Sequence, residues 1–113
     1  MPSKSPAQRL RDIVDNIDAI EAFIDGLDLA MFKKDRKTVY AVVRALEIIS
    51  EASRRLPGEL RERHLQIDWP AIAAAGNIYR HECDAVDEAL IRHTARNDLR
   101  ELRRVAAEEL GPL

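Results

Sequence analysis

Cysteine, aromatic side chains and excess charge are all scarce in this chain of 113 residues. The single cysteine, Cys83, excludes an internal disulfide and favours a reducing compartment, so we expect a cytoplasmic location. Aromatic residues make up only 4 % of the chain, too few for a row of rings on which the bases of a single strand could stack. The net charge of −2 gives no overall attraction for nucleic acid, so any such site requires a local basic patch.

Long apolar runs and metal-binding patterns are also missing. No segment approaches the roughly 20 apolar residues that cross a bilayer, and residues 1–6 lack the apolar stretch of a signal peptide. His81 and Glu82 resemble the start of a zinc-protease helix, but Ala85 stands where the second histidine of that motif belongs. We therefore expect no membrane association, no metal and no other cofactor.

What the chain has in abundance is apolar residues at helical spacing. Hydrophobic residues make up 46 % and charged residues 34 %, which is typical of a globular protein. Isoleucine, valine and leucine recur mostly every three or four positions, and no stretch alternates between apolar and polar residues as a half-buried strand does. The sequence predicts an all-α antiparallel bundle of four to five helices. We expect one domain over residues 1–113, with flexible ends at 1–5 and 111–113.

Capping residues, prolines and glycines mark where the helices start and stop. Serine or aspartate just before a proline is typical of a helix N-terminus, and glycine is typical of a C-terminal cap. These signals predict long helices up to about residue 25 and over about 35–55, a short turn of helix within 59–67, a helix up to about Cys83, and a last helix capped by Asp87. The boundary signals are Ser5-Pro6, Asp25-Gly26, Pro57-Gly58 and Asp68-Trp69-Pro70.

Titratable side chains concentrate in residues 72–87, where a run of small residues leads into Asn77, Arg80, His81 and Glu82. An imidazole, with an ordinary pKa of about 6.5, can serve as base or acid near neutral pH. A guanidinium matches the oxygens of a phosphate. On chemistry alone a structural or capping role for His81 is the commoner case, and catalysis is the alternative.

Two stretches together resemble the HepT-like toxins, a family within the small helical HEPN domains. Ala45–Leu56 is similar to the second-helix signature of that family, and Trp69–Asp87 is similar to its active-site helix and the turn that follows. The resemblance implies a helical ribonuclease that cleaves RNA without a metal ion. It also implies a motif of an arginine, a histidine after four to six further residues, and a tyrosine two residues later.

His81 matches the histidine of this motif, and Asn77 matches the polar residue that usually follows its arginine. The chain departs from the motif twice, because Gly76 stands at the arginine position and Cys83 at the tyrosine position. Arg80 is a candidate substitute cation. Adjacent helix residues point about 100° apart, however, so a dimer that joins two copies of the helix would ease its approach to the same phosphate. The candidate catalytic residues are His81, Arg80 and Asn77.

Besides RNA, the resemblance implies two protein partners. One is a second copy of the chain, in a homodimer. The other is a nucleotidyltransferase-type antitoxin, which in this family modifies the motif tyrosine; Tyr79 and Cys83 are the candidate modification sites here. If neither is modified, inhibition rests on binding alone. Because the motif arginine is absent, an inactive dimeric module that binds RNA or a nucleotidyltransferase is the alternative function, and a purely structural helical subunit is a third.

The last predicted helix carries a stripe of arginines. Arg92, Arg96 and Arg100 recur every four residues, and residues 103 and 104 continue the series, so most of these side chains share a face. Such a face can track an RNA backbone. A solvated face that pairs with neighbouring acids is the more frequent arrangement. The candidate partners for such pairing are Glu88, Asp98, Glu101 and Glu108.

Two glutamates and two histidines elsewhere need a separate interpretation. Glu47 and Glu51 lie four residues apart among apolar positions of the second long helix. A buried carboxylate needs a cationic partner. We therefore hypothesise that the two glutamates hold in place arginines of the site helix, the predicted helix that carries His81. His64 and His93 are isolated from other ligand types, and we interpret both as ordinary surface or core residues.

Overall fold

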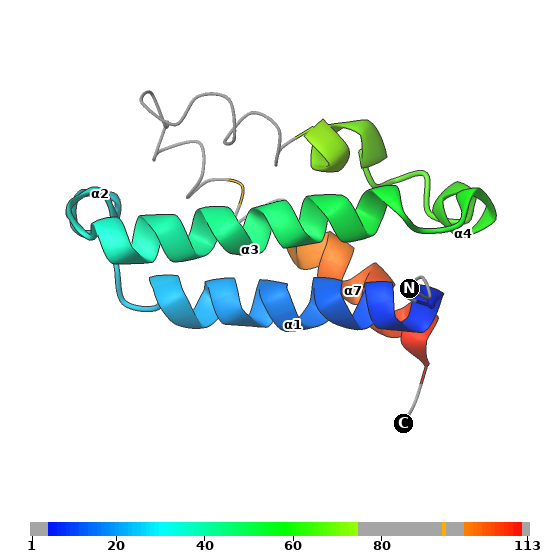
Figure 1. Cartoon of the computed structure of the whole chain (residues 1–113), viewed down its shortest axis with the longest axis horizontal. Helices are drawn as coiled ribbons and strands as arrows, with labels where there is room; N and C mark the ends of the chain where they lie inside the picture. The colour runs from blue at the N-terminus through cyan, green and yellow to red at the C-terminus, as the bar shows by residue number, and fades with distance from the viewer. Residues whose placement is uncertain (1–4, 75–93, 95–98, 112–113) are drawn as a thin grey trace.

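Every residue that the structure describes lies in a helix or in a short connection between helices. The structure, a computed structural model, describes residues 5–74, 94 and 99–111. No strand occurs among these residues, and the predicted all-α class is confirmed. The helices, in chain order, are α1 (Pro6–Ile24), α2 (Leu29–Lys34), α3 (Arg36–Arg54), α4 (Gly58–Glu62) and α7 (Leu99–Leu110) (Figure 1).

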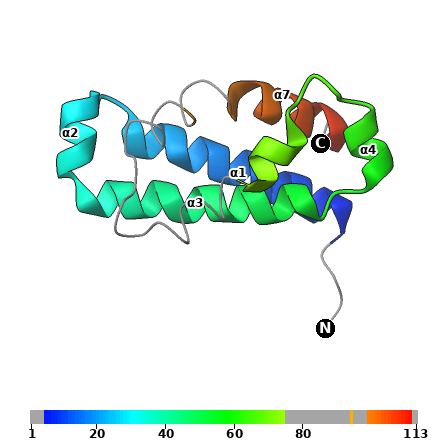
Figure 2. The ribbon, with the colours of Figure 1, turned by 90° about the horizontal axis from the view of Figure 1, so that it is seen from above.

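An antiparallel pair formed by α1 and α3 is the body of the molecule. Each of the two helices has 19 residues, and they lie side by side (Figure 1). Seen from above, α2 closes one end of the pair and α4 lies at the other end (Figure 2). α7 packs against α1. The N-terminal half of the chain is thus a scaffold against which the later segments pack.

Capping chemistry sets both ends of α1. The backbone N–H of Ser5 donates to Gln8 Oε1 at 2.8 Å, and Ser5 Oγ accepts from the backbone N–H of Gln8 at 3.2 Å. This reciprocal capping box satisfies donors that the first turn leaves free. After the helix, Gly26 adopts a φ of +77°, a left-handed conformation that strains residues with a Cβ. Both boundaries agree with the prediction from sequence.

Aspartates start the next two helices. Asp28 Oδ1 accepts from the backbone N–H of Met31 at 2.8 Å at the start of α2. Asp35 accepts from Thr38 twice at the start of α3, from the backbone N–H at 3.1 Å and from Oγ1 at 2.7 Å. α3 ends just before Pro57, as predicted, because proline cannot continue the hydrogen bonding of a helix.

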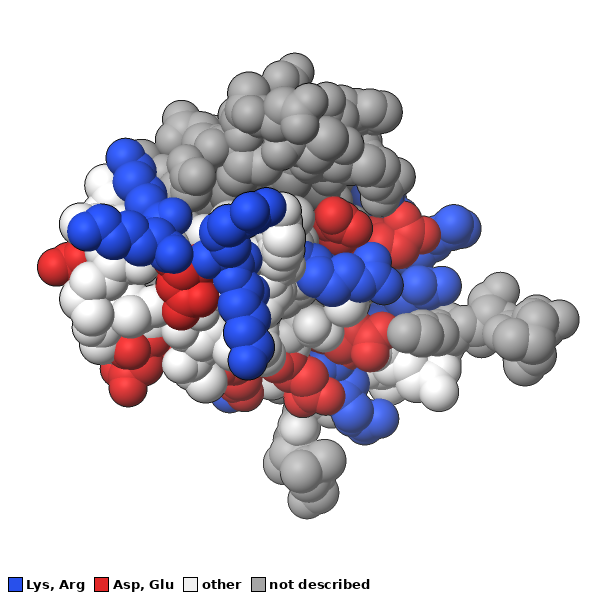
Figure 3. All heavy atoms as spheres, turned by 60° about the vertical axis from the view of Figure 1, so that its left-hand side comes forward, with Lys and Arg blue, Asp and Glu red and all other residues white. Residues whose placement is uncertain are grey.

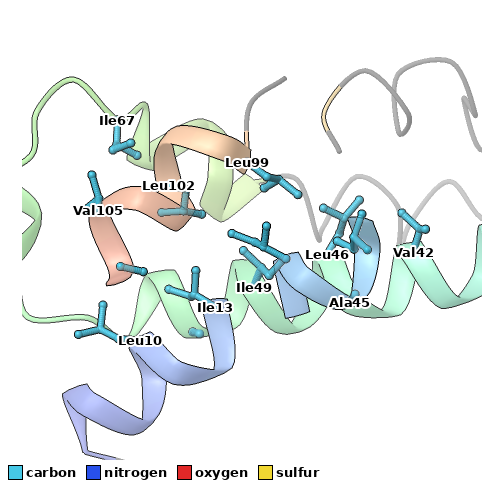
Figure 4. Packing of buried hydrophobic residues seen from close by; sticks show 14 of the residues in the cluster. Leu10, Ile13, Val42, Ala45, Leu46, Ile49, Ile67, Leu99, Leu102 and Val105 are labelled. Carbon is cyan, nitrogen blue, oxygen red and sulfur yellow. The ribbon is translucent and has the colours of Figure 1, made fainter. Parts of the chain in front are cut away.

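Apolar side chains from α1, α3 and α7 meet in a single core. Ile13, Ile49 and Leu102 are at most 1 % exposed and point into the common interior (Figure 4). Burying a side chain of this size contributes about 1.5–3 kcal/mol. The other buried apolar residues of these three helices are Leu10, Ile17, Ile20, Ile24, Val39, Val42, Ala45, Leu46, Ala52, Leu99, Val105 and Ala106.

Several predictions concern residues 1–4, 75–93, 95–98 and 112–113, which lie outside the described residues. They include most of both predicted flexible ends and the Asp87 cap. The predicted inward face of the last helix is confirmed at Leu99, Leu102 and Val105. Within the described ranges, no helix is both long and apolar enough to cross a membrane.

Candidate functional site

Of the site residues predicted from sequence, the structure describes only Arg100. The others lie outside the described residues, and so does Gly76, which stands at the motif arginine position. What the structure does show is the chain segment that leads to them and the helix that holds this segment. The predicted site residues outside the described ranges are Asn77, Tyr79, Arg80, His81, Cys83, Arg92 and Arg96.

The segment leading to the site begins as a capped helix. Residues 69–74 are helical, and the Asp68 carboxylate accepts from the backbone N–H of Ala71 at 3.1 Å. The Asp68 carbonyl accepts from the backbone N–H of Ile72 at 3.1 Å. The predicted cap and proline-started helix are therefore confirmed.

A buried tryptophan fixes where this helix starts. Trp69 is only 8 % exposed, and its indole Nε1–H lies 3.1 Å from the carbonyl oxygen of Arg61 and 3.0 Å from that of His64. Both carbonyls belong to the end of α4 and the turn that follows it. The shared donor ties this turn to the start of the site helix.

α3 also holds this helix. Ser50, 1 % exposed, donates from Oγ to the carbonyl oxygen of Ala73 at 2.7 Å. Arg54, one turn further along α3, places Nη1 at 3.5 Å from the same oxygen. Ala73 precedes Gly76 by three residues. A side chain of α3 thus brings positive charge to the segment directly before the position where the motif arginine is missing.

Glu51 orients that arginine. One of its carboxylate oxygens lies 2.6 Å from Arg54 Nη2 and the other 2.9 Å from Arg55 Nε. Hydrogen bonds from Arg55 and Arg54 hold the pKa of Glu51 below its ordinary value. The side chain of Arg54 is 33 % exposed, so it is accessible to solvent while it is held in place.

The hypothesis that two glutamates on α3 hold arginines of the site helix stays a prediction, because Arg80 lies outside the described residues. Their described partners are local, since Glu47 pairs with Arg44 at 3.3 Å, and Glu51 pairs with Arg54 on α3 and with Arg55, the residue that follows the helix. The physical reason is spacing, because residues three or four apart on a helix are neighbours. Sequence reasoning missed Arg54, although it lies within the stretch Ala45–Leu56 that carries the family resemblance.

Three members of the predicted arginine stripe, Arg100, Arg103 and Arg104, lie on α7, and two of them pair with described acids. Arg103 makes two contacts with the Asp18 carboxylate on α1, at 2.6 and 3.1 Å. Arg104 pairs with Glu101 and Glu108, two of the acids expected to neutralise it. Arg100 is exposed and pairs with no carboxylate among the described residues.

His64 is half-buried, in agreement with its interpretation as an ordinary surface or core residue, and it also makes a contact that was not predicted. Its Nε2 lies 2.5 Å from Glu109 Oε2 on α7, and Arg63 Nη2 lies 2.8 Å from Glu109 Oε1. Hydrogen bonds from Arg63 and then His64 hold the pKa of Glu109 at about 2. The cluster joins the turn after α4 to α7. His93 lies outside the described residues.

A groove of about 290 Å³ runs between α1 and α3. It contains no histidine, cysteine or hydroxyl side chain, and its acids outnumber its arginines. It therefore has neither a nucleophile nor a uniform charge for a polyanion. Its lining residues are Arg9, Asp12, Arg44, Glu47, Ile48, Glu51 and Ala52. In the described ranges no three histidine, cysteine or acidic side chains come together as metal ligands would.

Comparison with known proteins covers residues outside the described ranges as well. Residues 13–109 match the family described as ribonuclease HepT-like. The chain is 34 % identical over 100 residues to the probable ribonuclease HepT of Thermococcus cleftensis, which covers 88 % of this chain and 91 % of that protein. It is 33 % identical over 107 residues to a candidate RNase of Caldanaerobacter subterraneus, with 95 % and 96 % covered. A candidate RNase of Methanocaldococcus jannaschii is 29 % identical over 115 residues. No solved structure matches the chain.

Proposed function

This chain belongs to the HepT-like ribonuclease family, and from that premise we propose that it is a toxin that cleaves RNA internally without a metal ion. The relatives support the ribonuclease activity by their names and by their coverage of almost the whole chain. The observation that carries the proposal in the structure is the support of the site helix by Ser50 and Arg54.

The reaction requires three groups. A base takes the proton from the ribose 2′-hydroxyl, whose oxygen attacks the adjacent phosphorus. An acid protonates the departing 5′-oxygen, and a cation stabilises the charge on the pentacoordinate phosphate. The products are a 2′,3′-cyclic phosphate and a 5′-hydroxyl, so no water is consumed in this step. We assign the proton transfers to His81, with Arg80 as a cation and Asn77 as a polar contact.

Arg54 is a second candidate cation. The motif arginine is replaced by Gly76, and Arg54 reaches the carbonyl of Ala73, three residues earlier in the chain. A guanidinium keeps its charge at any physiological pH and has donors on several sides, so it can contact a phosphate while it stays paired with Glu51. Arg54 then supplies from α3 the charge that the motif lacks at Gly76.

The proposed partners are a second copy of the chain and a nucleotidyltransferase-type antitoxin. A homodimer would bring two site helices together and relax the angular separation of Arg80 from His81. The antitoxin would modify Tyr79 or Cys83, or inhibit by binding alone. These partners follow from the family resemblance, and the compartment that we propose with them is the cytoplasm.

The alternative is a catalytically inactive dimeric module that binds RNA or a nucleotidyltransferase. The absence of an arginine at Gly76 favours it. The two functions differ in what they require of the imidazole: an enzyme needs His81, whereas a binding module tolerates its loss.

The deciding experiment is RNA cleavage by the purified chain in excess EDTA, beside a His81→Ala variant. We expect cleavage by the parent and none by the variant. The matched control is His64→Gln, which removes a histidine whose described role is a contact with Glu109, and we expect it to cleave as the parent does. Absence of cleavage by the parent across several RNA pools, or full cleavage by His81→Ala, contradicts the enzymatic proposal.

A further inference from the structure

We infer that the end of the molecule formed by α2 and the start of α3 binds the phosphate backbone of single-stranded RNA. This inference rests on the proposed ribonuclease function and deepens it by assigning a surface that holds the substrate. We call the surface the basic corner. It consists of Lys33, Lys34, Arg36 and Lys37.

All four cations of the basic corner are exposed and lie within five successive positions. The one acid among them, Asp35, is occupied as the N-cap of α3, where it accepts from Thr38 Oγ1 and the Thr38 backbone N–H. These hydrogen bonds hold the pKa of Asp35 below its ordinary value, so the carboxylate is charged at neutral pH. An excess of three positive charges remains in residues 33–37.

The backbone directs these charges to one end of the molecule. Lys33 and Lys34 lie in the last turn of α2, and Arg36 and Lys37 lie in the first turn of α3. The chain changes direction at Asp35, which lies between the two helices. Figure 3 turns this end of the molecule forward and shows Lys and Arg side chains standing out from it.

The basic corner differs from most of the described arginines because none of its cations lies within ion-pair distance of a described carboxylate, although Lys37 interacts electrostatically with Asp35 at longer range. None of its four cations pairs with a carboxylate among the residues that the structure describes. Elsewhere in those residues, ion pairs with carboxylates engage Arg44, Arg54, Arg55, Arg63, Arg103 and Arg104. Although the net charge of the chain is −2, these four exposed cations within residues 33–37 form no ion pair with the acids that the structure describes, and such a local patch is what a polyanion requires.

An exposed aromatic ring next to these cations favours RNA over an acidic protein. Tyr40 is 63 % exposed, and Arg36 Nη2 donates to its hydroxyl at 2.8 Å. The Arg36 guanidinium carbon lies 5.6 Å from the ring centre. An unpaired base can stack on such a ring while phosphates contact the lysines, which is how single strands are held without sequence preference. One ring serves one base, consistent with the few aromatic residues of the chain.

The test is binding of a fluorescein-labelled oligouridylate with 2′-O-methyl riboses, which cannot be cleaved through the 2′-oxygen. Fluorescence anisotropy measures the affinity over a series of KCl concentrations. For the variant Lys33→Gln/Lys34→Gln/Lys37→Gln we expect at least about tenfold weaker binding at low salt. We also expect the slope of log affinity against log salt to become shallower by about 2, because each lost phosphate contact removes about 0.7.

Matched variants separate charge from other effects. The variant Lys33→Arg/Lys34→Arg/Lys37→Arg keeps the charge and should bind as the parent does. Arg55→Gln removes an exposed arginine that is already paired with Glu51, and should change neither affinity nor slope. Tyr40→Ala should weaken binding about fivefold, whereas Tyr40→Phe keeps the ring and should not. Circular dichroism confirms the fold of each variant.

Unchanged affinity and slope in the triple glutamine variant overturn the inference. That result would favour an acidic protein as the partner of the basic corner. Because the probe cannot be cleaved, binding is measured independently of His81. Probe binding through the basic corner without any cleavage of RNA in EDTA would overturn the catalytic proposal and support the binding surface.

Discussion

The hydroxyl of Ser50, buried on α3, donates a hydrogen bond of 2.7 Å to the carbonyl oxygen of Ala73, 23 residues further along the chain. This bond joins the N-terminal scaffold to the helix that leads to the predicted catalytic residues. Within the described residues, Arg54 contacts the same carbonyl oxygen, and Trp69 anchors the start of this helix in the core.

Replacing Ser50 by alanine removes that bond, and we expect the free energy of unfolding to fall by about 1 kcal/mol. The matched control is Ser53→Ala. Ser53 is equally buried, but its hydroxyl donates a hydrogen bond to the Ser50 carbonyl on the same helix. The control should change the free energy of unfolding by only about a few tenths of a kcal/mol in either direction, because a hydrogen bond from a helix serine to its own helix adds no net stability. Urea unfolding followed by circular dichroism measures both. Equal losses would contradict the special role of Ser50.

Arg54 and Arg55 form a second matched pair, for activity. Both pair with Glu51, but only Arg54 also contacts the Ala73 carbonyl. If Arg54 supplies the missing cation, Arg54→Gln lowers kcat/KM for RNA cleavage at least about tenfold, a modest value for the loss of one charged donor to a phosphate. Arg55→Gln should leave kcat/KM unchanged. Cleavage assays in EDTA on folded variants test this, and equal activities would exclude Arg54 from the reaction.

Glu109 makes stability depend on acid pH. Its pKa in the folded chain is about 2, below its ordinary value of 4.5, because Arg63 and His64 hydrogen-bond to the charged form. The stabilisation is therefore complete above about pH 4.5 and is lost as the pH falls toward 2. We expect Glu109→Gln to lower the free energy of unfolding by about 1–2 kcal/mol near neutral pH, and to flatten its decline in that acidic range.

Glu108 is the control for this prediction. It is the neighbouring residue, its side chain is 61 % exposed, and its described partner is the exposed Arg104. Glu108→Gln should change the free energy of unfolding by less than about 0.5 kcal/mol. Urea unfolding at a series of pH values compares the three proteins. A parent and a Glu109→Gln variant with parallel pH profiles would show that the cluster does not hold the carboxylate in its charged form.

Two glycines should respond in opposite directions to alanine. An added Cβ meets no atom within 4 Å at Gly26 or at Gly58, so neither substitution creates a clash. Gly26 has a φ of +77°, and Gly26→Ala should lower the free energy of unfolding by about 1 kcal/mol. Gly58 is the first residue of α4 with an ordinary φ, so Gly58→Ala should leave stability unchanged or raise it by up to about 1 kcal/mol. Thermal unfolding measures the stability of both variants. If Gly58→Ala lowers stability as Gly26→Ala does, the explanation from backbone conformation is contradicted.

Local signals predicted most of the described fold. Ser5, Gly26 and Asp68 each act through residues within four positions along the chain, so the sequence contains all the information that their capping requires. The inward faces of the helices follow equally from spacing. The pairing of Glu51 with Arg55 is local as well, and the interval of four residues between them could have predicted it.

Contacts between segments that are distant in the sequence could not be predicted from these local signals. Arg103 pairs with Asp18, 85 residues away, because α7 packs against α1 in one particular rotation, which no local pattern specifies. The contact of Arg54 with Ala73 depends in the same way on how two helices cross. The resemblance selected His81 by matching it to a motif, and the geometry around that residue stays a prediction.

The indole of Trp69 also gives the chain an internal optical signal. It is the single tryptophan of the protein, enclosed at the start of the site helix with its N–H between two carbonyls. Its emission spectrum depends on that enclosure, so a shift to longer wavelength reports that water has reached this junction. The ultraviolet-excited emission of the unlabelled protein can therefore follow detachment of the site helix separately from the melting of α1 and α3.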